Sequence, residues 1–139
     1  MADASYSLQP IGVVRSSLHD IRTAPNQAYE GAPEAVLELK DELAPALHLV
    51  EPGQDLILLT WLHQADRSVL QTHPRGDPAT PLTGVFATRS PDRPNPIGLH
   101  RVTVTAVESP TVLRVSALEA IDGTPILDLK VAMNEASDA

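Results

Sequence analysis

The chain has 139 residues and carries 18 acidic against 10 basic side chains, which gives a formal net charge of −8. This acidic balance argues against broad electrostatic binding to a polyanion, and the absence of cysteine excludes disulfides and thiolate chemistry. The length suits one domain, no apolar run is long enough to span a membrane, and the N-terminus lacks a signal-peptide pattern. We therefore expect a single domain, residues 1–139, in the cytoplasm.

The first part of the chain predicts two strands around a long loop. Residues 8–15 and 34–40 are the strands, and acidic and aliphatic residues alternate in the second of them, as in a half-exposed strand. Residues 16–33 are polar and rich in turn formers, and loops of this length are usually functional or disordered. Within this loop, residues 24–27 either contact the edge of a ligand through their amides or form an ordinary polar turn.

A short helix and a buried strand are expected next. Residues 41–50 predict a helix that is capped by Asp41 and has Pro45 in its first turn. Nearly continuous apolar sequence over 55–63 predicts a central strand that is buried on both faces. This strand delivers His63 to the edge of the core, where a histidine is either a satisfied structural residue or part of a site. A second long loop follows it.

Residues 84–98 have the most distinctive combination of residues in the chain, and we call them the arch. They begin with a β-prone run, 84–88, which predicts a strand, and they continue through prolines that cannot donate to a sheet. Each residue before a proline is pushed towards extended geometry, so the arch should be stiff. It carries Arg89, Arg93 and Asn95. Polar groups on a stiff loop indicate a binding site.

The end of the chain predicts three more strands. Residues 97–107 and 111–118 alternate as the two strands of a hairpin. Residues 121–124 have the composition of a turn, and a last strand follows at 125–130. Seven strands with one or two short helices indicate a mainly β domain, either a small barrel or a sandwich.

The pattern of residues excludes several chemistries. The 5 histidines show no paired metal-ligand spacing, so we expect no metal. The sequence has no serine nucleophile elbow and no glycine-rich turn from a strand into a helix, which argues against a serine hydrolase and a Rossmann fold. The residues alone therefore predict a small β domain whose arch binds a nucleoside-like or anionic ligand.

The arch, Gly-Val-Phe-Ala-Thr-Arg-Ser-Pro-Asp-Arg-Pro-Asn-Pro-Ile-Gly, resembles the signature of the TrmO family, whose members are also called TsaA-like, VirR-like or YaeB-like proteins. Supporting matches are Ile-Gly-Val-Val-Arg-Ser at 11–16, Trp-Leu-His-Gln at 61–64 and Asp-Gly-Thr-Pro-Ile-Leu-Asp-Leu-Lys at 122–130. Together these stretches cover the chain nearly end to end.

The resemblance implies a fold and an activity. The fold is a small, seven-stranded TsaA-like β-barrel that binds S-adenosylmethionine and assembles as a homodimer. The activity is that of an S-adenosylmethionine-dependent methyltransferase, which methylates N6 of threonylcarbamoyladenosine next to the tRNA anticodon. The acidic net charge weakens the case for tRNA as a partner. Two alternatives stay open, a methyltransferase of a small metabolite and a non-catalytic S-adenosylmethionine-binding module.

The resemblance also assigns site residues by motif. The implied cofactor contacts are Pro25, Asn26, Gln27, His63, Gln64, Arg89, Leu99, Ile121, Asp122, Gly123 and Thr124. The candidates for substrate binding are Arg93, Asn95, Arg101 and Lys130. Arg89 would hold the carboxylate of the cofactor or an acceptor anion, whereas Asp122 either balances the positive charge of the cofactor or caps a turn. No residue is assigned as catalytic.

The chain departs from the family pattern at two places. Asn26 stands where the family usually has arginine, so a permanent charge and its planar donor fork are missing. After Lys130 the chain continues with residues 131–133, Val-Ala-Met, where the family usually has a proline and a tyrosine.

Overall fold

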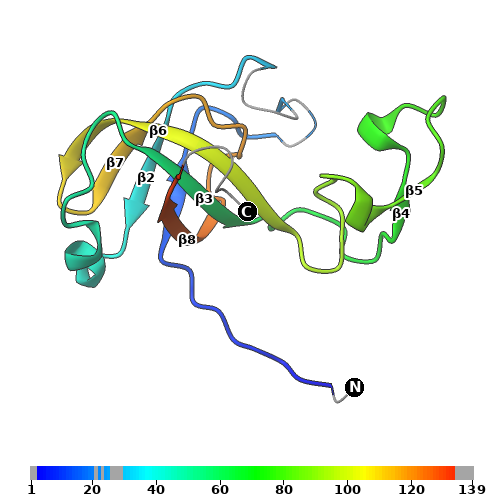
Figure 1. The fold of residues 1–139 in the computed structure, drawn as a ribbon, viewed down its shortest axis with the longest axis horizontal. Helices are drawn as coiled ribbons and strands as arrows, with labels where there is room; N and C mark the ends of the chain where they lie inside the picture. Colours follow the sequence, from blue (N-terminus) through cyan, green and yellow to red (C-terminus); the bar gives the residue numbers. More distant parts are fainter. Residues whose placement is uncertain (1–2, 21, 23, 26–29, 134–139) are drawn as a thin grey trace.

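A closed barrel of six antiparallel strands forms the centre of the fold (Figure 1). The structure is a computed structural model, and it describes residues 3–20, 22, 24–25 and 30–133. The barrel strands are β1 (Gly12–Arg15), β2 (Ala35–Leu39), β3 (Asp55–Trp61), β6 (Ile97–Ser109), β7 (Val112–Val115) and β8 (Pro125–Val131). Their order is β1-β2-β7-β6-β3-β8, and β8 closes the barrel because it pairs with both β3 and β1.

The prediction of a mainly β barrel is confirmed, but the barrel has six strands and not seven. The strand expected at 84–88 is wrong. Only Thr83–Gly84 (β5) is extended there, and it pairs with β4 (Gln71–Thr72) in a separate two-stranded sheet. The 3-10 helix η4 (Val85–Ala87) follows at once, and the Thr88 N–H closes it by donating to the Val85 carbonyl at 3.1 Å.

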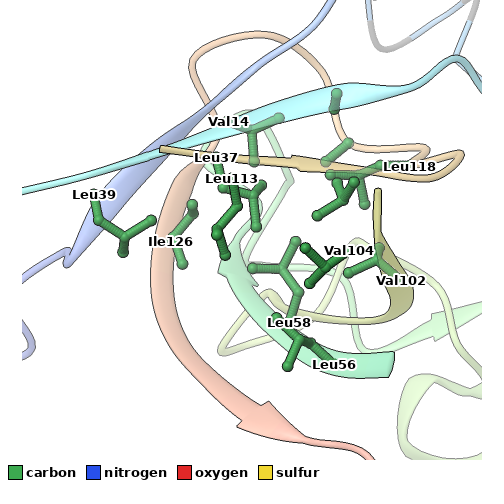
Figure 2. Close-up of a cluster of buried hydrophobic side chains, with 13 residues drawn as sticks. Val14, Leu37, Leu39, Leu56, Leu58, Val102, Val104, Leu113, Leu118 and Ile126 are labelled. Carbon is green, nitrogen blue, oxygen red and sulfur yellow. The ribbon is translucent and has the colours of Figure 1, made fainter. Parts of the chain in front are cut away.

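Apolar side chains from every barrel strand meet in one interior (Figure 2). The core includes Val14, Leu37, Leu58, Val102, Leu113 and Ile126, one from each strand. Along β3 only Leu56, Leu58 and Thr60 are buried, and their neighbours are half-buried. The expectation of a strand buried on both faces is therefore wrong, because alternate residues of a barrel strand face outwards.

The helix expected at 41–50 is the 3-10 helix η2 (Asp41–Leu47). Lys40 occupies the N-cap position and no side chain caps the helix, so the expected cap by Asp41 is wrong. Pro45 lies in its middle and disfavours an α-helix, because the ring would clash with the carbonyl four residues earlier. η3 (Pro74–Gly76) and η4 are further short 3-10 helices, whereas one or two short helices were expected. No helix in the described part of the chain is long and apolar enough to cross a membrane.

The chain between β3 and β6, residues 62–96, extends away from the barrel, and we call it the arm (Figure 1). Its two ends meet at the barrel, where the Leu62 N–H donates to the Pro96 carbonyl at 2.8 Å. Arg67 fastens the arch at a second point, because Nε donates to the Pro94 carbonyl at 2.7 Å and Nη2 donates to Asn95 Oδ1 at 3.1 Å. The same guanidinium lies 5.1 Å from the centre of the Trp61 ring. The arch is thus tied to the end of β3.

Arg93 holds the arch from within. Its Nε donates to the Ser90 carbonyl at 2.9 Å, and its Nη2 donates to the Thr88 carbonyl at 2.7 Å and to the Val85 carbonyl. Backbone acceptors need partners, and the guanidinium supplies one to each of these three carbonyls. The Val85 carbonyl also accepts from the N–H and the hydroxyl of Thr88, so these acceptors are satisfied without a neighbouring strand.

We expect Arg93→Met to loosen the arch while the barrel stays folded. Methionine keeps part of the aliphatic length but leaves the three carbonyls without their charged donor, which should lower the free energy of unfolding by about 2–3 kcal/mol. Amide hydrogen exchange should become faster over residues 85–97 and stay unchanged in the barrel strands.

The matched control is Arg114→Met. Arg114 pairs with Glu108 at 2.7 Å on an exposed part of the β6–β7 hairpin, so its loss should cost less than about 1 kcal/mol. Equal losses of stability and unchanged exchange in the arch for both variants would contradict the role of Arg93.

Candidate ligand-binding cavity

A cavity of about 450 Å³ opens where five segments of the chain meet. These are the loop before β2, the end of β3, the arch, the start of β6 and the connection from β7 to β8. Its lining consists of Ala24, Pro25, Leu62, His63, Gln64, Arg89, Ser90, Pro91, Arg93, Ile97, Gly98, Leu99, His100, Glu119, Ala120, Ile121 and Thr124. The volume lies in the usual range of small-molecule sites.

The structure brings most of the predicted cofactor contacts to this one cavity. Pro25, His63, Gln64, Arg89, Leu99, Ile121 and Thr124 line it, as does Arg93 from the predicted substrate contacts. Asn26 and Gln27 lie outside the described residues. Asp122 and Gly123 are not in the lining, although the residues on either side of them are.

Asp122 and Gly123 shape the turn that presents their neighbours. Asp122 Oδ1 accepts a hydrogen bond from the Ser16 N–H at 3.0 Å, and the Gly123 N–H donates to the Val14 carbonyl at 2.8 Å. Gly123 has a φ of 84°, which a side chain would strain. Asp122 thus ties the turn to the segment that follows β1, and His19 Nδ1 lies 3.8 Å from its other carboxylate oxygen.

The two arginines of the arch differ in their surroundings. Arg93 donates from Nε and Nη2 to the three carbonyls of the arch. Arg89 is exposed, lines the cavity and forms no hydrogen bond or ion pair with any residue in the described ranges. Arg89 is therefore the guanidinium that is available to an anionic ligand, and Arg93 positions the loop that carries it.

The other predicted substrate contacts lie outside the cavity lining. Asn95 accepts a hydrogen bond from Arg67 at 3.1 Å. Arg101 pairs with Asp55 at 3.3 Å, and Lys130 pairs with Asp128 at 3.0 Å. A substrate that reached these side chains would contact the molecule outside the cavity.

The sequence analysis missed a polar pair in the lining, which consists of the buried His100 and the partly buried Glu119. His100 Nδ1 lies 2.5 Å from Glu119 Oε1, and His100 Nε2 lies 2.8 Å from Thr60 Oγ1. One signal in the sequence could have revealed His100, because it shares the inward register of β6 with Gly98, Val102 and Val104. A polar residue at a core position of a strand calls for a partner. The position of Glu119 has no comparable signal.

Gly98 makes room for this pair. A Cβ at this position would lie 2.4 Å from Thr60 Oγ1 and 2.6 Å from His100 Nε2, so any side chain would break the contact between them. The groups that approach the backbone closely at Gly98 are therefore these two side chains. Within the described part of the chain, no three histidine or acidic side chains are grouped so that they could hold a metal ion.

Comparison with known proteins agrees with this architecture. The family described as "tRNA-methyltransferase O N-terminal domain" matches residues 13–138. An "S-adenosyl-L-methionine-binding protein" of Archaeoglobus fulgidus is 42% identical over 123 residues, which cover 88% of this chain and 86% of that protein. A "Probable S-adenosyl-L-methionine-binding protein" of Methanothermobacter thermautotrophicus is 38% identical over 130 residues, which cover 94% of this chain and 92% of that protein.

Solved structures of TrmO share the fold. One superposes with a TM-score of 0.76 at 32% identity and covers 100% of this chain and 62% of its own. The TrmO crystal structure from Pseudomonas aeruginosa gives a TM-score of 0.72 at 32% identity and covers 98% of this chain and 61% of its own. The chain thus spans about three fifths of these TrmO chains. Since the family match extends over nearly the whole sequence, the chain belongs to the TrmO N-terminal domain family.

Proposed function

We propose that the chain is an S-adenosylmethionine-dependent methyltransferase of TrmO type that binds its cofactor in the cavity. The observation that carries this proposal is the pairing of an available guanidinium, Arg89, with an apolar wall in one cavity of about 450 Å³. S-adenosylmethionine carries a carboxylate at one end and a flat adenine at the other, so it matches both features. The names of the two archaeal relatives as S-adenosyl-L-methionine-binding proteins support the choice.

The cavity suits the demands of methyl transfer. Displacement at a sulfonium methyl group is accelerated mainly by alignment and by exclusion of water, and it needs no nucleophile on the protein. Arg89 would bind the carboxylate through a forked contact, and Leu99 and Ile121 would pack near the adenosine. The prolines, Arg67 and Arg93 restrain the arch before any ligand binds, which lowers the entropy lost on binding.

We expect Arg89→Ala to weaken S-adenosylmethionine binding by roughly 10-fold to 100-fold, which corresponds to the loss of a charged hydrogen-bonding contact. Isothermal titration calorimetry measures the affinity, and the thermal melting midpoint without ligand should stay unchanged because Arg89 is exposed. Arg114→Met replaces a side chain that is not part of the lining, so it is the control and should bind as the original chain does. Unchanged affinity in Arg89→Ala would argue against this site.

The proposed acceptor is N6 of threonylcarbamoyladenosine next to the tRNA anticodon. Membership of a family described as a tRNA-methyltransferase domain supports it. Mass spectrometry of tRNA nucleosides from cells with and without the gene tests it. Loss of the methylated nucleoside in the deletion strain, and its return with the gene, is the expected result, and an unchanged pool would remove the tRNA assignment.

A small-metabolite acceptor is the second candidate, and the charge of the molecule favours it. The net charge is −8, and two of the cations considered for substrate binding, Arg101 and Lys130, are paired with aspartates. Failure to bind bulk tRNA at physiological salt, with cofactor binding intact, would favour this candidate. Cofactor binding without turnover on any tRNA or metabolite pool would instead identify a binding module.

A homodimer is the proposed assembly. Leu70, Leu82 and Phe86 flank the β4–β5 ribbon on the arm and are 65%, 56% and 83% exposed, so this part of the arm presents three large apolar side chains to solvent. A second copy would cover them. Sedimentation equilibrium should give twice the mass of one chain, and Phe86→Ser should shift the equilibrium towards the single chain. A single-chain mass at every concentration would contradict the dimer.

A further inference from the structure

Three polar side chains form a line from the barrel core to the cavity. Thr60, on β3, is 0% exposed, and its Oγ1 lies 2.8 Å from His100 Nε2. His100, on β6, is 6% exposed, and its Nδ1 lies 2.5 Å from Glu119 Oε1. The hydrogen-bonded line therefore ends on a carboxylate that lines the cavity.

Only one member of this line is placed to meet a ligand. Thr60 is buried and does not line the cavity. His100 lines it, but both of its ring nitrogens are engaged within the protein. Glu119 is engaged through Oε1, and Oε2 has no hydrogen-bond partner among the described residues. Since no buried side-chain polar atom of those residues lacks a partner, Oε2 must reach accessible space.

Glu119 is also the one carboxylate among the described residues of the lining. The other titratable or charged side chains that face the cavity are His63, Arg89, Arg93 and His100. The arginines hold their protons too tightly to act as bases. His63 is exposed and is fixed by no hydrogen bond from the described residues, whereas His100 fixes Glu119. A group that is both a base and held in place by a second group is the usual arrangement for proton transfer.

Methyl transfer to a nitrogen that bears hydrogen, such as the ureido N6 of threonylcarbamoyladenosine, releases a proton that must be removed. The nitrogen lone pair forms a bond to the methyl carbon while the carbon–sulfur bond breaks, and its electron pair stays on sulfur, which becomes a neutral thioether. The methylated nitrogen then carries an extra proton, which it must release to a base. Nothing in the proposed binding of the cofactor supplies that base.

We propose that Glu119 accepts this proton from the acceptor nitrogen and that His100, anchored by Thr60, positions the carboxylate. The proposal rests on the proposed methyltransferase function. In the transfer step the acceptor N–H bond breaks, an O–H bond forms on Glu119, and the carboxylic acid afterwards returns the proton to water. Glu119 is the catalytic residue, and His100 is a positioning residue.

The test is single-turnover methyl transfer by the full chain, from radiolabelled S-adenosylmethionine to total tRNA of a strain that lacks the gene. Glu119→Gln keeps the size and an acceptor oxygen for His100 but cannot take the proton. We expect its rate at saturating cofactor and tRNA to fall by roughly 100-fold to 10,000-fold, with cofactor affinity within about twofold of the original chain. Glu108→Gln, an exposed carboxylate on β6, is the control and should keep the original rate.

Two further variants keep the test decisive if Glu119→Gln folds poorly. Glu119→Asp retains a base but withdraws it by one methylene, and we expect about a tenfold lower kcat at unchanged KM. His100→Gln should lower kcat with little change in KM, because it releases the carboxylate without touching the acceptor. A rise in KM alone for either variant would identify a binding role and overturn the proposal.

The outcomes separate this proposal from the function on which it rests. An original rate in Glu119→Gln at saturating cofactor overturns the role of Glu119 and leaves the methyltransferase standing. If Glu119→Gln binds the cofactor tenfold more weakly but has the original rate at saturating cofactor, Glu119 is a cofactor contact. That result overturns the proposal as well. If the unaltered chain transfers no methyl group, both the proposed tRNA function and this role fail together.

Discussion

The register of β3 against β6 is the constraint on which the cavity depends. Thr60 lies opposite Gly98 and Leu58 lies opposite His100, so the pairing brings the threonine, the glycine and the histidine to one place. A slip of one residue would turn His100 outwards and send its neighbours Leu99 and Arg101 into the barrel. The register is fixed from the other side too, because β3 also pairs with β8 and the barrel closes around it. The polar end of the cavity is thus a product of barrel closure.

Much of this arrangement could be predicted from the sequence, for physical reasons. Alternation in residues 34–40 and 97–107 reports directly which side chains face the core, so these strands were placed correctly. Motifs located most of the cavity lining because short stretches such as 61–64 stay contiguous in space. The fold supplied the rest, since a strand pattern cannot reveal that Val85 and Thr88 give their carbonyls to Arg93. The contact of His100, on β6, with Glu119, in the connection from β7 to β8, has no local signature.

The arch shows how two residues of one type come to do different things. Arg89 and Arg93 are four positions apart, carry the same charge and both line the cavity, yet only Arg93 donates hydrogen bonds to backbone carbonyls of the arch. A guanidinium with several donors in a fixed plane can replace a strand as the partner of irregular backbone. Arg93 thereby gives these loop carbonyls a hydrogen-bond donor. Arg89 remains available to a ligand. In an acidic protein, this concentrates useful positive charge at one point.

The arm has a consequence for how such a protein can change over time. β3 and β6 are neighbouring antiparallel strands that a tight hairpin could join, but the chain makes an excursion of residues 62–96 between them and closes it with the Leu62 to Pro96 hydrogen bond. The entropic cost of such an excursion grows only slowly with its length. Its outer portion can therefore lengthen, shorten or be exchanged between relatives without disturbing the barrel. Evolution can therefore alter the outer part of the arm, around β4 and β5, while the barrel and the cavity at its end are kept.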